Sequence, residues 1–415
     1  MALDSRFNQR PAFAAANLAL FALIASSSLN AQQNHDGLVP VDVANTNHQL
    51  MAPPGTTISK VADLAVPRLI SLGRDGEMFI GSQAGRVYRL SPPYEQGEIL
   101  VRFDDYPHSV SQRGEKLYVA TTDALLAADY RPGDKPGEND FARVVRIPGG
   151  GGHSSRTLVT GPDERLYVAL GIQGNCSNQY IGDDYRFENQ RGGIMVLDER
   201  GDSPQWQPYA TGLRNPVGLA FDHQGTLYAT NNGPDHWGYE EPREVLVRAE
   251  QGNFFGMPWF QWIEGEYRRD DCINGESPRP VEDISNFVAT FPARSAPMDL
   301  SFVPQGSSLG LDAVVAVRGS WATKPDGGAS GDPATRREPL IAGIALDSSG
   351  NGQIHELLTG FQDEQGNRWA RPVGIAFTDS STFYFTSDSG ETGLYRVSFA
   401  NDNLAMGNLL SKPDD

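Results

Sequence analysis

The stretch PVGLAFDHQGTLYATNNGP, residues 216–234, decides the fold of this chain. It contains an apolar run, a polar turn with Asp and Gly, and a second run that begins Leu-Tyr. Two apolar runs joined by such a turn predict a β-hairpin with one apolar face. The pattern recurs along the chain, and its six copies begin at Leu69, His108, Ser155, Pro216, Met298 and Pro372.

The repetition predicts how the hairpins are arranged. A hairpin with one apolar face cannot bury that face alone, so neighbouring copies must stack. The spacing of about 40 to 80 residues is typical of four-stranded blades with inserted loops. We therefore expect an all-β protein in which residues 58–400 form a six-bladed β-propeller, with an irregular segment over residues 32–57 and a flexible tail over residues 401–415. A ring of blades gathers its loops around one central opening, where we expect the functional site.

Composition limits the classes of partner. The chain has 415 residues and a formal net charge of −18. Its length would allow more than one domain, but the repeats favour one. Because so acidic a chain repels phosphate groups, we expect no nucleic acid partner. The charge is typical of a soluble exported protein.

The N-terminus resembles an export signal over residues 1–31. Arg6 and Arg10 form a basic start, and the apolar run over residues 13–25 is too short for a membrane span. Cleavage is expected after Ala31, although the large Leu29 leaves an uncleaved anchor as the alternative. No later segment has the length and apolarity of a transmembrane span. We expect a periplasmic or secreted protein.

The two cysteines, Cys176 and Cys272, fit that compartment. An even number of cysteines in an exported chain predicts one disulfide, and the alternative is two unpaired thiols. Neither cysteine lies in a nucleophile motif, so cysteine catalysis is not expected.

Polar residues gather at the ends of the predicted strands. His153 follows four glycines and could act as a base near neutral pH, or be a simple loop residue. The turn over residues 231–235, Asn-Asn-Gly-Pro-Asp, could present main-chain carbonyls to Ca2+, although the same residues form ordinary tight turns. Arginines at strand boundaries could form an anion-binding opening or pair with surface carboxylates, and they are Arg214, Arg318, Arg368 and Arg371.

Several motifs, in order, resemble one family. They are H-x-S-x-x-L-V-x-G-P-D-x-x-L-Y over residues 153–167, G-L-R-N-P-x-G-L-A-F over 212–221, N-G-P-D over 232–235, G-N-F-F-G-M-P over 252–258, and R-G-S-W over 318–321. Together they resemble the soluble quinoprotein sugar dehydrogenases. These are the aldose dehydrogenases that use Ca2+ and pyrroloquinoline quinone (PQQ), with their sorbosone-dehydrogenase-like relatives. The resemblance covers residues 58–399.

The resemblance implies a role for each matching residue. His153 matches the general base, and Arg214 and Asn215 match the pair that contacts the quinone. Gly233 and Pro234 match the residues whose main-chain carbonyls hold Ca2+ beside PQQ. The remaining cofactor-binding positions are matched by Arg318, Arg368 and Arg371. Arginines suit this cofactor, because it carries three carboxylates.

The chain also departs from the family. Ile172 stands where the glucose enzymes have the Asp that orients the base. We therefore expect His153 to be oriented by Asp183, by Asp184 or by no carboxylate. Arg318 stands where the sorbosone branch usually has His. The second blade lacks the family's cofactor-contacting Gln segment. These departures favour the sorbosone-like branch.

The resemblance implies a periplasmic oxidoreductase that oxidises an aldose or aldosone at its reducing carbon and passes hydride to PQQ. An external electron acceptor would then reoxidise the cofactor. One alternative is a calcium-dependent lactonase, which would place carboxylates and Asn around the metal. Another is a catalytically silent propeller that binds a sugar or a protein, and the loss of Asp at Ile172 favours that alternative.

Overall fold

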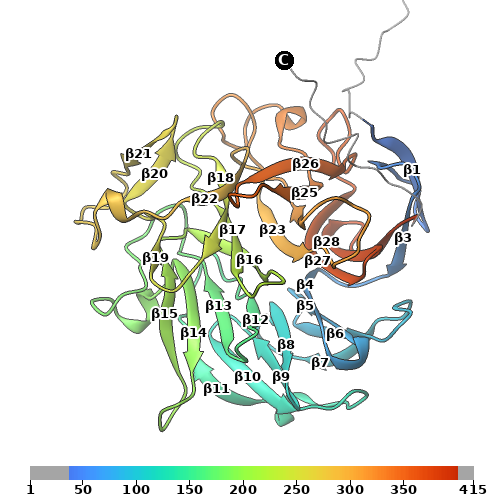
Figure 1. The fold of residues 1–415 in the computed structure, drawn as a ribbon, viewed down its shortest axis with the longest axis horizontal. Helices are drawn as coiled ribbons and strands as arrows, with labels where there is room; N and C mark the ends of the chain where they lie inside the picture. The colour runs from blue at the N-terminus through green and yellow to red at the C-terminus, as the bar shows by residue number, and fades with distance from the viewer. Residues whose placement is uncertain (1–36, 401–415) are drawn as a thin grey trace, which may run out of the picture. The chain divides into compact units, whose positions relative to one another are not determined.

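The structure is a computed structural model and describes residues 37–400 (Figure 1). The predicted signal over residues 1–31 and the predicted tail over residues 401–415 lie outside the described residues. The described chain is built of strands, and its helices are the five single 3-10 turns Arg74–Gly76, Glu138–Asp140, Phe187–Asn189, Val281–Asp283 and Pro333–Thr335. None of these turns is long and apolar enough to cross a membrane.

Six antiparallel sheets form the blades, and in each the strands follow one another from the inside of the ring outward. The first three blades are β4 (Pro67–Leu72), β5 (Met78–Ser82), β6 (Arg86–Leu90) and β7 (Glu98–Arg102); β8 (Ser109–Arg113), β9 (Lys116–Ala120), β10 (Ala124–Asp129) and β11 (Ala142–Arg146); and β12 (Leu158–Thr160), β13 (Leu166–Leu170), β14 (Gly193–Asp198) and β15 (Gln205–Thr211), with β19 (Asn253–Phe254) parallel to β15.

The other three blades follow the same order. They are β16 (Asn215–Phe221), β17 (Leu227–Asn232), β18 (Glu244–Ala249) and β22 (Phe287–Phe291); β23 (Pro297–Phe302), β24 (Ala313–Val317), β25 (Leu340–Leu346) and β26 (Gly352–Leu358); and β27 (Ala370–Asp379), β28 (Thr382–Gly390), β29 (Gly393–Phe399) and β3 (Thr56–Ala62). A separate hairpin, β20 (Phe260–Ile263) with β21 (Glu266–Arg269), is inserted in the fourth blade.

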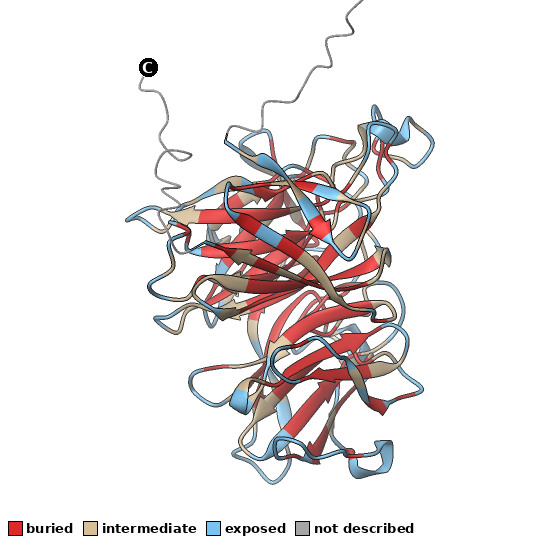
Figure 2. Ribbon diagram, turned by 90° about the vertical axis from the view of Figure 1, so that its right-hand side faces the viewer, coloured by how far each residue is buried: buried red, intermediate tan, exposed pale blue. Residues whose placement is uncertain are grey.

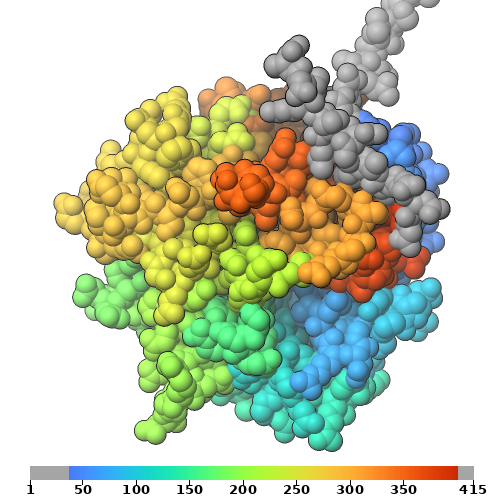
Figure 3. Space-filling model, viewed as in Figure 1, coloured from blue at the N-terminus to red at the C-terminus, as the bar shows by residue number. Residues whose placement is uncertain are grey.

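The blades close into a ring. The innermost strands touch in the cyclic order β4, β8, β12, β16, β23, β27 and back to β4. Figure 3 shows the same order, because the colours run round the ring from blue to red. The predicted six-bladed β-propeller is therefore confirmed.

The apolar faces of neighbouring blades pack against each other. In Figure 2 the strands are mostly buried and the loops mostly exposed. Leu69, Val217, Met298 and Val373, from four inner strands, form one buried cluster at the centre of the ring. This cluster fixes the level of the inner strands relative to one another, so residues just before it lie at the same end of the ring.

One expectation was wrong. The described part of the segment 32–57 is not irregular, because it contains β1 (Val39–Ala44) and β2 (Gln49–Ala52). β1 pairs with β2 and, in parallel, with β3, so that both strands extend the sixth blade. Val43 and Leu50 are buried there, and these few apolar residues among polar ones gave too weak a strand pattern in the sequence.

Ring closure by β3 is testable. Ile58 of β3 is buried and Thr57 faces solvent, so the two residues report on opposite faces of one strand. Ile58→Ala should lower the free energy of unfolding by about 2–5 kcal/mol, because it leaves a cavity in the sixth blade. Thr57→Ala should change it by less than about 0.5 kcal/mol. Equal effects in urea unfolding would contradict a closing role for the buried face of β3.

Candidate functional site

Strand direction places the predicted site residues at one rim of the ring. In each blade the inner strand starts, and the antiparallel second strand ends, at the same rim, which we call the mouth. Arg214 directly precedes β16, and Asn215 begins it. Gly233 directly follows β17, and Arg318 directly follows β24. Arg371 is the second residue of β27. The topology thus brings residues more than 150 positions apart to one rim.

His153 is held by a main-chain carbonyl. Its Nδ1 lies 2.5 Å from the carbonyl oxygen of Ile172. Since a carbonyl can only accept, Nδ1 carries the hydrogen and Nε2 keeps its lone pair. The partner of the ring is therefore neither Asp183 nor Asp184, which the sequence had suggested. The backbone of Ile172 orients the ring, although its side chain cannot.

The surroundings of His153 keep the imidazole neutral. Burial and the nearby Arg214 guanidinium lower its pKa to about 4, and Arg191 and Arg156 act in the same direction. No carboxylate is among the causes of this shift. The ring is therefore unprotonated at neutral pH, as a general base must be.

Arg156 and Arg191 are buried and bonded to carbonyls. Arg191 donates to the main-chain oxygens of Gly149, Gly151, Gly171 and His153. Arg156 donates to those of Thr122, Pro148, His153 and Ser155. The four glycines before His153 therefore wrap around Arg191, and Gly150 and Gly152 do so with positive φ.

Asn215 lies next to His153. A Cβ added to Gly171 would lie 2.5 Å from Asn215 Oδ1 and 2.6 Å from His153 Cβ, so only glycine fits between the two side chains. Asn215 Oδ1 is buried and has no hydrogen-bond partner. A buried amide oxygen without a donor is costly, which points to a missing ligand group at this position.

Arg214 is buried beside His153 and makes polar contacts on three sides. It donates to Asn175 Oδ1 at 2.7 Å and to the carbonyl oxygen of Asn232 at 3.3 Å. Its Nη2 lies 3.6 Å from Asp235 Oδ2. The main-chain carbonyl of Arg214 accepts a hydrogen bond from the amide of Ile172. Arg214 is therefore bonded to the same residue whose carbonyl holds His153.

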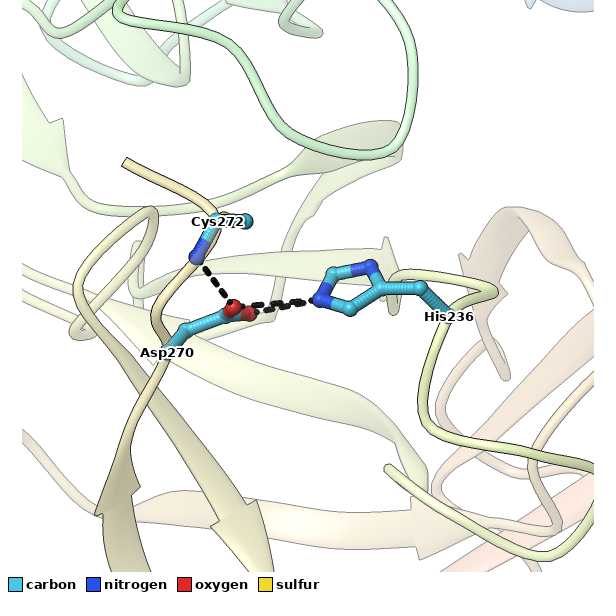
Figure 4. A group of neighbouring side chains, drawn as sticks. All are labelled: His236, Asp270 and Cys272. Atoms are coloured by element: carbon cyan, nitrogen blue, oxygen red, sulfur yellow. Dashed lines mark hydrogen bonds and ion pairs between the residues drawn. The ribbon is translucent and has the colours of Figure 1, made fainter. Parts of the chain in front are cut away.

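The disulfide between Cys176 and Cys272 is present, with the two Cα atoms 6.0 Å apart. It fastens the loop that carries Asn175 to the inserted hairpin. Beside it, buried Asp270 accepts from Cys272 N and from His236 Nε2 (Figure 4). His236, Asp270 and Cys272 lie close enough to suggest a metal site, but the Cys272 sulfur is already bonded.

A second cluster of arginines lies on the other side of the mouth. Asp388 Oδ2 is 2.5 Å from Arg68 Nη1, and Asp388 Oδ1 is 3.0 Å from Arg318 Nε. Arg371 donates to the carbonyls of Arg318 and Gly319. Burial, then Arg318 and Arg368, lower the pKa of Arg371 to about 9. Two arginines thus share one carboxylate, and a third has none, so this side of the mouth is positive.

Two predicted residues have other contacts. Arg368 Nε donates to Gln362 and its Nη2 to the carbonyl of Arg337, so two of its guanidinium nitrogens already have partners, although its charge still acts on Arg371. The carbonyl oxygen of Pro234, predicted to hold Ca2+, lies 2.5 Å from Arg294 Nη1, which donates to it.

Arg68 and Arg294 were not singled out from the sequence. Each lies near the start of an inner strand, as Arg214 and Arg371 do, but at a different distance from the proline at the start of the repeat's apolar run. Aligned copies therefore show no single arginine position, and neither residue lies in the motifs quoted above.

The comparisons agree with this geometry. The TrAA12-like family model matches residues 51–258, half of the chain. The chain belongs to the TrAA12-like family. Quinoprotein glucose dehydrogenase B of Acinetobacter calcoaceticus is 30% identical over 140 residues, and the match covers 28% of each protein. The predicted resemblance to the soluble quinoprotein sugar dehydrogenases is confirmed.

Solved structures share the fold over nearly their whole length. The PQQ domain of pyranose dehydrogenase from Coprinopsis cinerea is 17% identical with a TM-score of 0.66, and 85% of this chain and 98% of that one are covered. The calcium structure of the Trichoderma reesei AA12 enzyme is 18% identical with a TM-score of 0.69, with 86% and 98% covered. The PQQ-bound aldose sugar dehydrogenase of Streptomyces coelicolor is 15% identical with a TM-score of 0.57, with 84% and 100% covered.

The neutral state of His153 predicts a pH-dependent stability. Its pKa is lower in the folded chain than in the unfolded chain, so the unfolded chain takes up a proton first as the pH falls below about 6.5. Between pH 7 and pH 4.5 this should cost the apoprotein about 2 to 3 kcal/mol. Urea unfolding of His153→Gln should show a correspondingly smaller loss. Equal losses in both proteins would contradict the assigned environment.

Proposed function

We propose that the protein is a periplasmic or secreted PQQ-dependent dehydrogenase that oxidises an aldose or aldosone at its reducing carbon. The observation that carries the proposal is the pair of His153 and Asn215 in a mouth lined by arginines. His153 has a lone pair on Nε2, and Asn215 has an unsatisfied buried oxygen. Family membership and the quinoprotein relative support the same chemistry.

The residues of the mouth fit PQQ. Arg214, Arg318 and Arg371 would hold its carboxylates, because guanidinium groups bind carboxylates through charge-assisted hydrogen bonds. The Nε of Arg68 is buried without a partner, and Asn215 Oδ1 is likewise unsatisfied. When bound, the quinone supplies a two-electron acceptor for hydride.

His153 performs the proton transfer. Its Nε2 would accept the proton of the sugar hydroxyl while the carbon that bears this hydroxyl gives its hydride to the bound quinone, and the Ile172 carbonyl keeps the ring in the productive tautomer. The low pKa of the ring beside Arg214 would favour release of that proton afterwards. The expected product is a lactone or an acid, and an external acceptor then takes the electrons.

Ca2+ does not fit these residues in the same way. Of the two carbonyls that the resemblance implies, that of Pro234 already accepts from Arg294. The lactonase alternative, which needs a metal ion, loses support. The motif R-G-S-W from Arg318 keeps the sorbosone-like branch as the proposed substrate class.

A single pair of variants tests the base. The purified protein is loaded with PQQ, and dye reduction is followed over a panel of aldoses and aldosones. His153→Ala should lower kcat by about 100-fold or more, because the proton acceptor is lost. His223 is the matched control, since it also bonds a main-chain carbonyl but lines the cavity of about 300 Å3 at the opposite end of the ring.

The same panel separates the alternatives. His223→Ala should behave as the unchanged protein does. Hydrolysis of lactones without quinone would favour the lactonase. Binding of a sugar without turnover in either assay would favour the silent propeller and contradict the proposal.

Trp321 is the proposed platform for the sugar. It is 50% exposed, the most of the large apolar side chains that the structure describes. It stands three residues after Arg318, on backbone that Arg371 fastens through the Arg318 and Gly319 carbonyls. An aromatic face held at the mouth suits the apolar side of a sugar ring. The function therefore predicts a binding role for Trp321.

Steady-state kinetics measure that role. Trp321→Ala should raise KM about tenfold and leave kcat nearly unchanged, because it removes binding area far from the proton transfer. Leu72→Ala is the control, since Leu72 is exposed at the opposite end of the ring. An unchanged KM in Trp321→Ala would exclude contact between this ring and the sugar.

A further inference from the structure

One buried arginine holds the loop that the resemblance assigns to a metal. Arg294 is 1% exposed. Its Nη1 lies 2.5 Å from the Pro234 carbonyl oxygen and 3.0 Å from Asp235 Oδ1. Its Nη2 donates to the carbonyl oxygens of Gly238 and Glu241. A single guanidinium thus binds four oxygens of the loop over residues 234–241.

The backbone around Arg294 is built to place it there. Arg294 has a φ of 70° and Ala296 a φ of 54°, a conformation that costs a non-glycine residue free energy. The segment is fixed on both sides of Arg294, since Arg337 Nε donates to the Ala293 carbonyl at 3.2 Å and Ala296 N donates to Glu244 Oε2 at 2.5 Å. These hydrogen bonds therefore hold the Arg294 backbone in the conformation that points its side chain into the loop.

The oxygens that Arg294 binds are of the kind that Ca2+ prefers. Calcium in proteins is held by main-chain carbonyls and carboxylates. At this loop the Pro234 carbonyl and the Asp235 carboxylate are already bonded to Arg294, and Arg214 lies 3.6 Å from the other oxygen of Asp235. A divalent cation at these atoms would stand beside two positive side chains and be repelled.

We infer that Arg294 takes the place of a metal ion at this loop, so that the mouth binds a quinone tricarboxylate without Ca2+. The inference rests on the proposed function. Arg294 acts here as a positioning residue: it holds the Pro234–Glu241 backbone in place and adds a fixed positive charge behind Arg214. Unlike an ion, a guanidinium on the chain cannot be removed by a chelator.

Binding measurements test this without turnover. The protein is treated with EDTA and titrated with PQQ by isothermal calorimetry, with and without millimolar Ca2+, and Ca2+ alone is titrated in the same way. The unchanged protein should bind PQQ in EDTA with a Kd within about twofold of that in Ca2+. It should show no binding of Ca2+ alone.

Arg294→Ala should reverse this behaviour. The variant frees the Pro234 carbonyl and the Asp235 carboxylate, so its affinity for PQQ should fall about tenfold in EDTA and recover with Ca2+. Arg243→Ala is the matched control, because it removes an exposed positive charge next to Glu244 that does not contact the loop carbonyls. The control should bind as the unchanged protein does.

Each outcome of these titrations either supports or overturns the inference. If the unchanged protein binds PQQ only with Ca2+, the inference is wrong and the proposed function stands. If it binds PQQ under neither condition, the proposed function fails and the inference with it. If Arg294→Ala binds PQQ in EDTA as tightly as the unchanged protein, Arg294 has no such role. Should the variant not fold, the two titrations of the unchanged protein still decide.

Discussion

The mouth depends on arginines that are buried against main-chain carbonyls rather than against carboxylates. Arg156 and Arg191 each donate to four carbonyl oxygens. Burial lowers the pKa of Arg156 to about 9 and that of Arg191 to about 10. Carbonyl dipoles satisfy the N–H groups but do not cancel the charge. A chain with a net charge of −18 thus keeps a positive opening.

This charge has to be held by the fold, because arginines in one place repel each other. The ring does so by bringing the starts of six inner strands together, with the buried cluster around Leu69 and Val373 fixing their level. Two of the carboxylates there, Asp388 and Asp235, each lie between two arginines. Asp388 lies between Arg68 and Arg318, and Asp235 between Arg214 and Arg294. The remaining positive charge is what a tricarboxylate would neutralise.

The sequence predicted the fold well, because each hairpin carries its own local signal of apolar runs and turn residues. Strand direction, which follows from the hairpin pattern, brings His153 and Asn215 to one rim. The sequence could not predict the Ile172 carbonyl as the partner of His153, because a main-chain atom leaves no mark in the residue type. For the same reason the contact of Arg294 with the Pro234 carbonyl could not be predicted.

The charge of the mouth also links ligand binding to the strength of the base. Arg214 is, after burial, the largest cause of the low pKa of His153. A carboxylate that pairs with Arg214 would cancel the part of the shift that comes from Arg214, while burial, the largest cause, would remain. By reciprocity, any rise in the pKa of His153 on binding of the polyanion equals a gain in polyanion affinity on protonation of His153. Occupation of the mouth and the basicity of His153 are in this way coupled through one guanidinium.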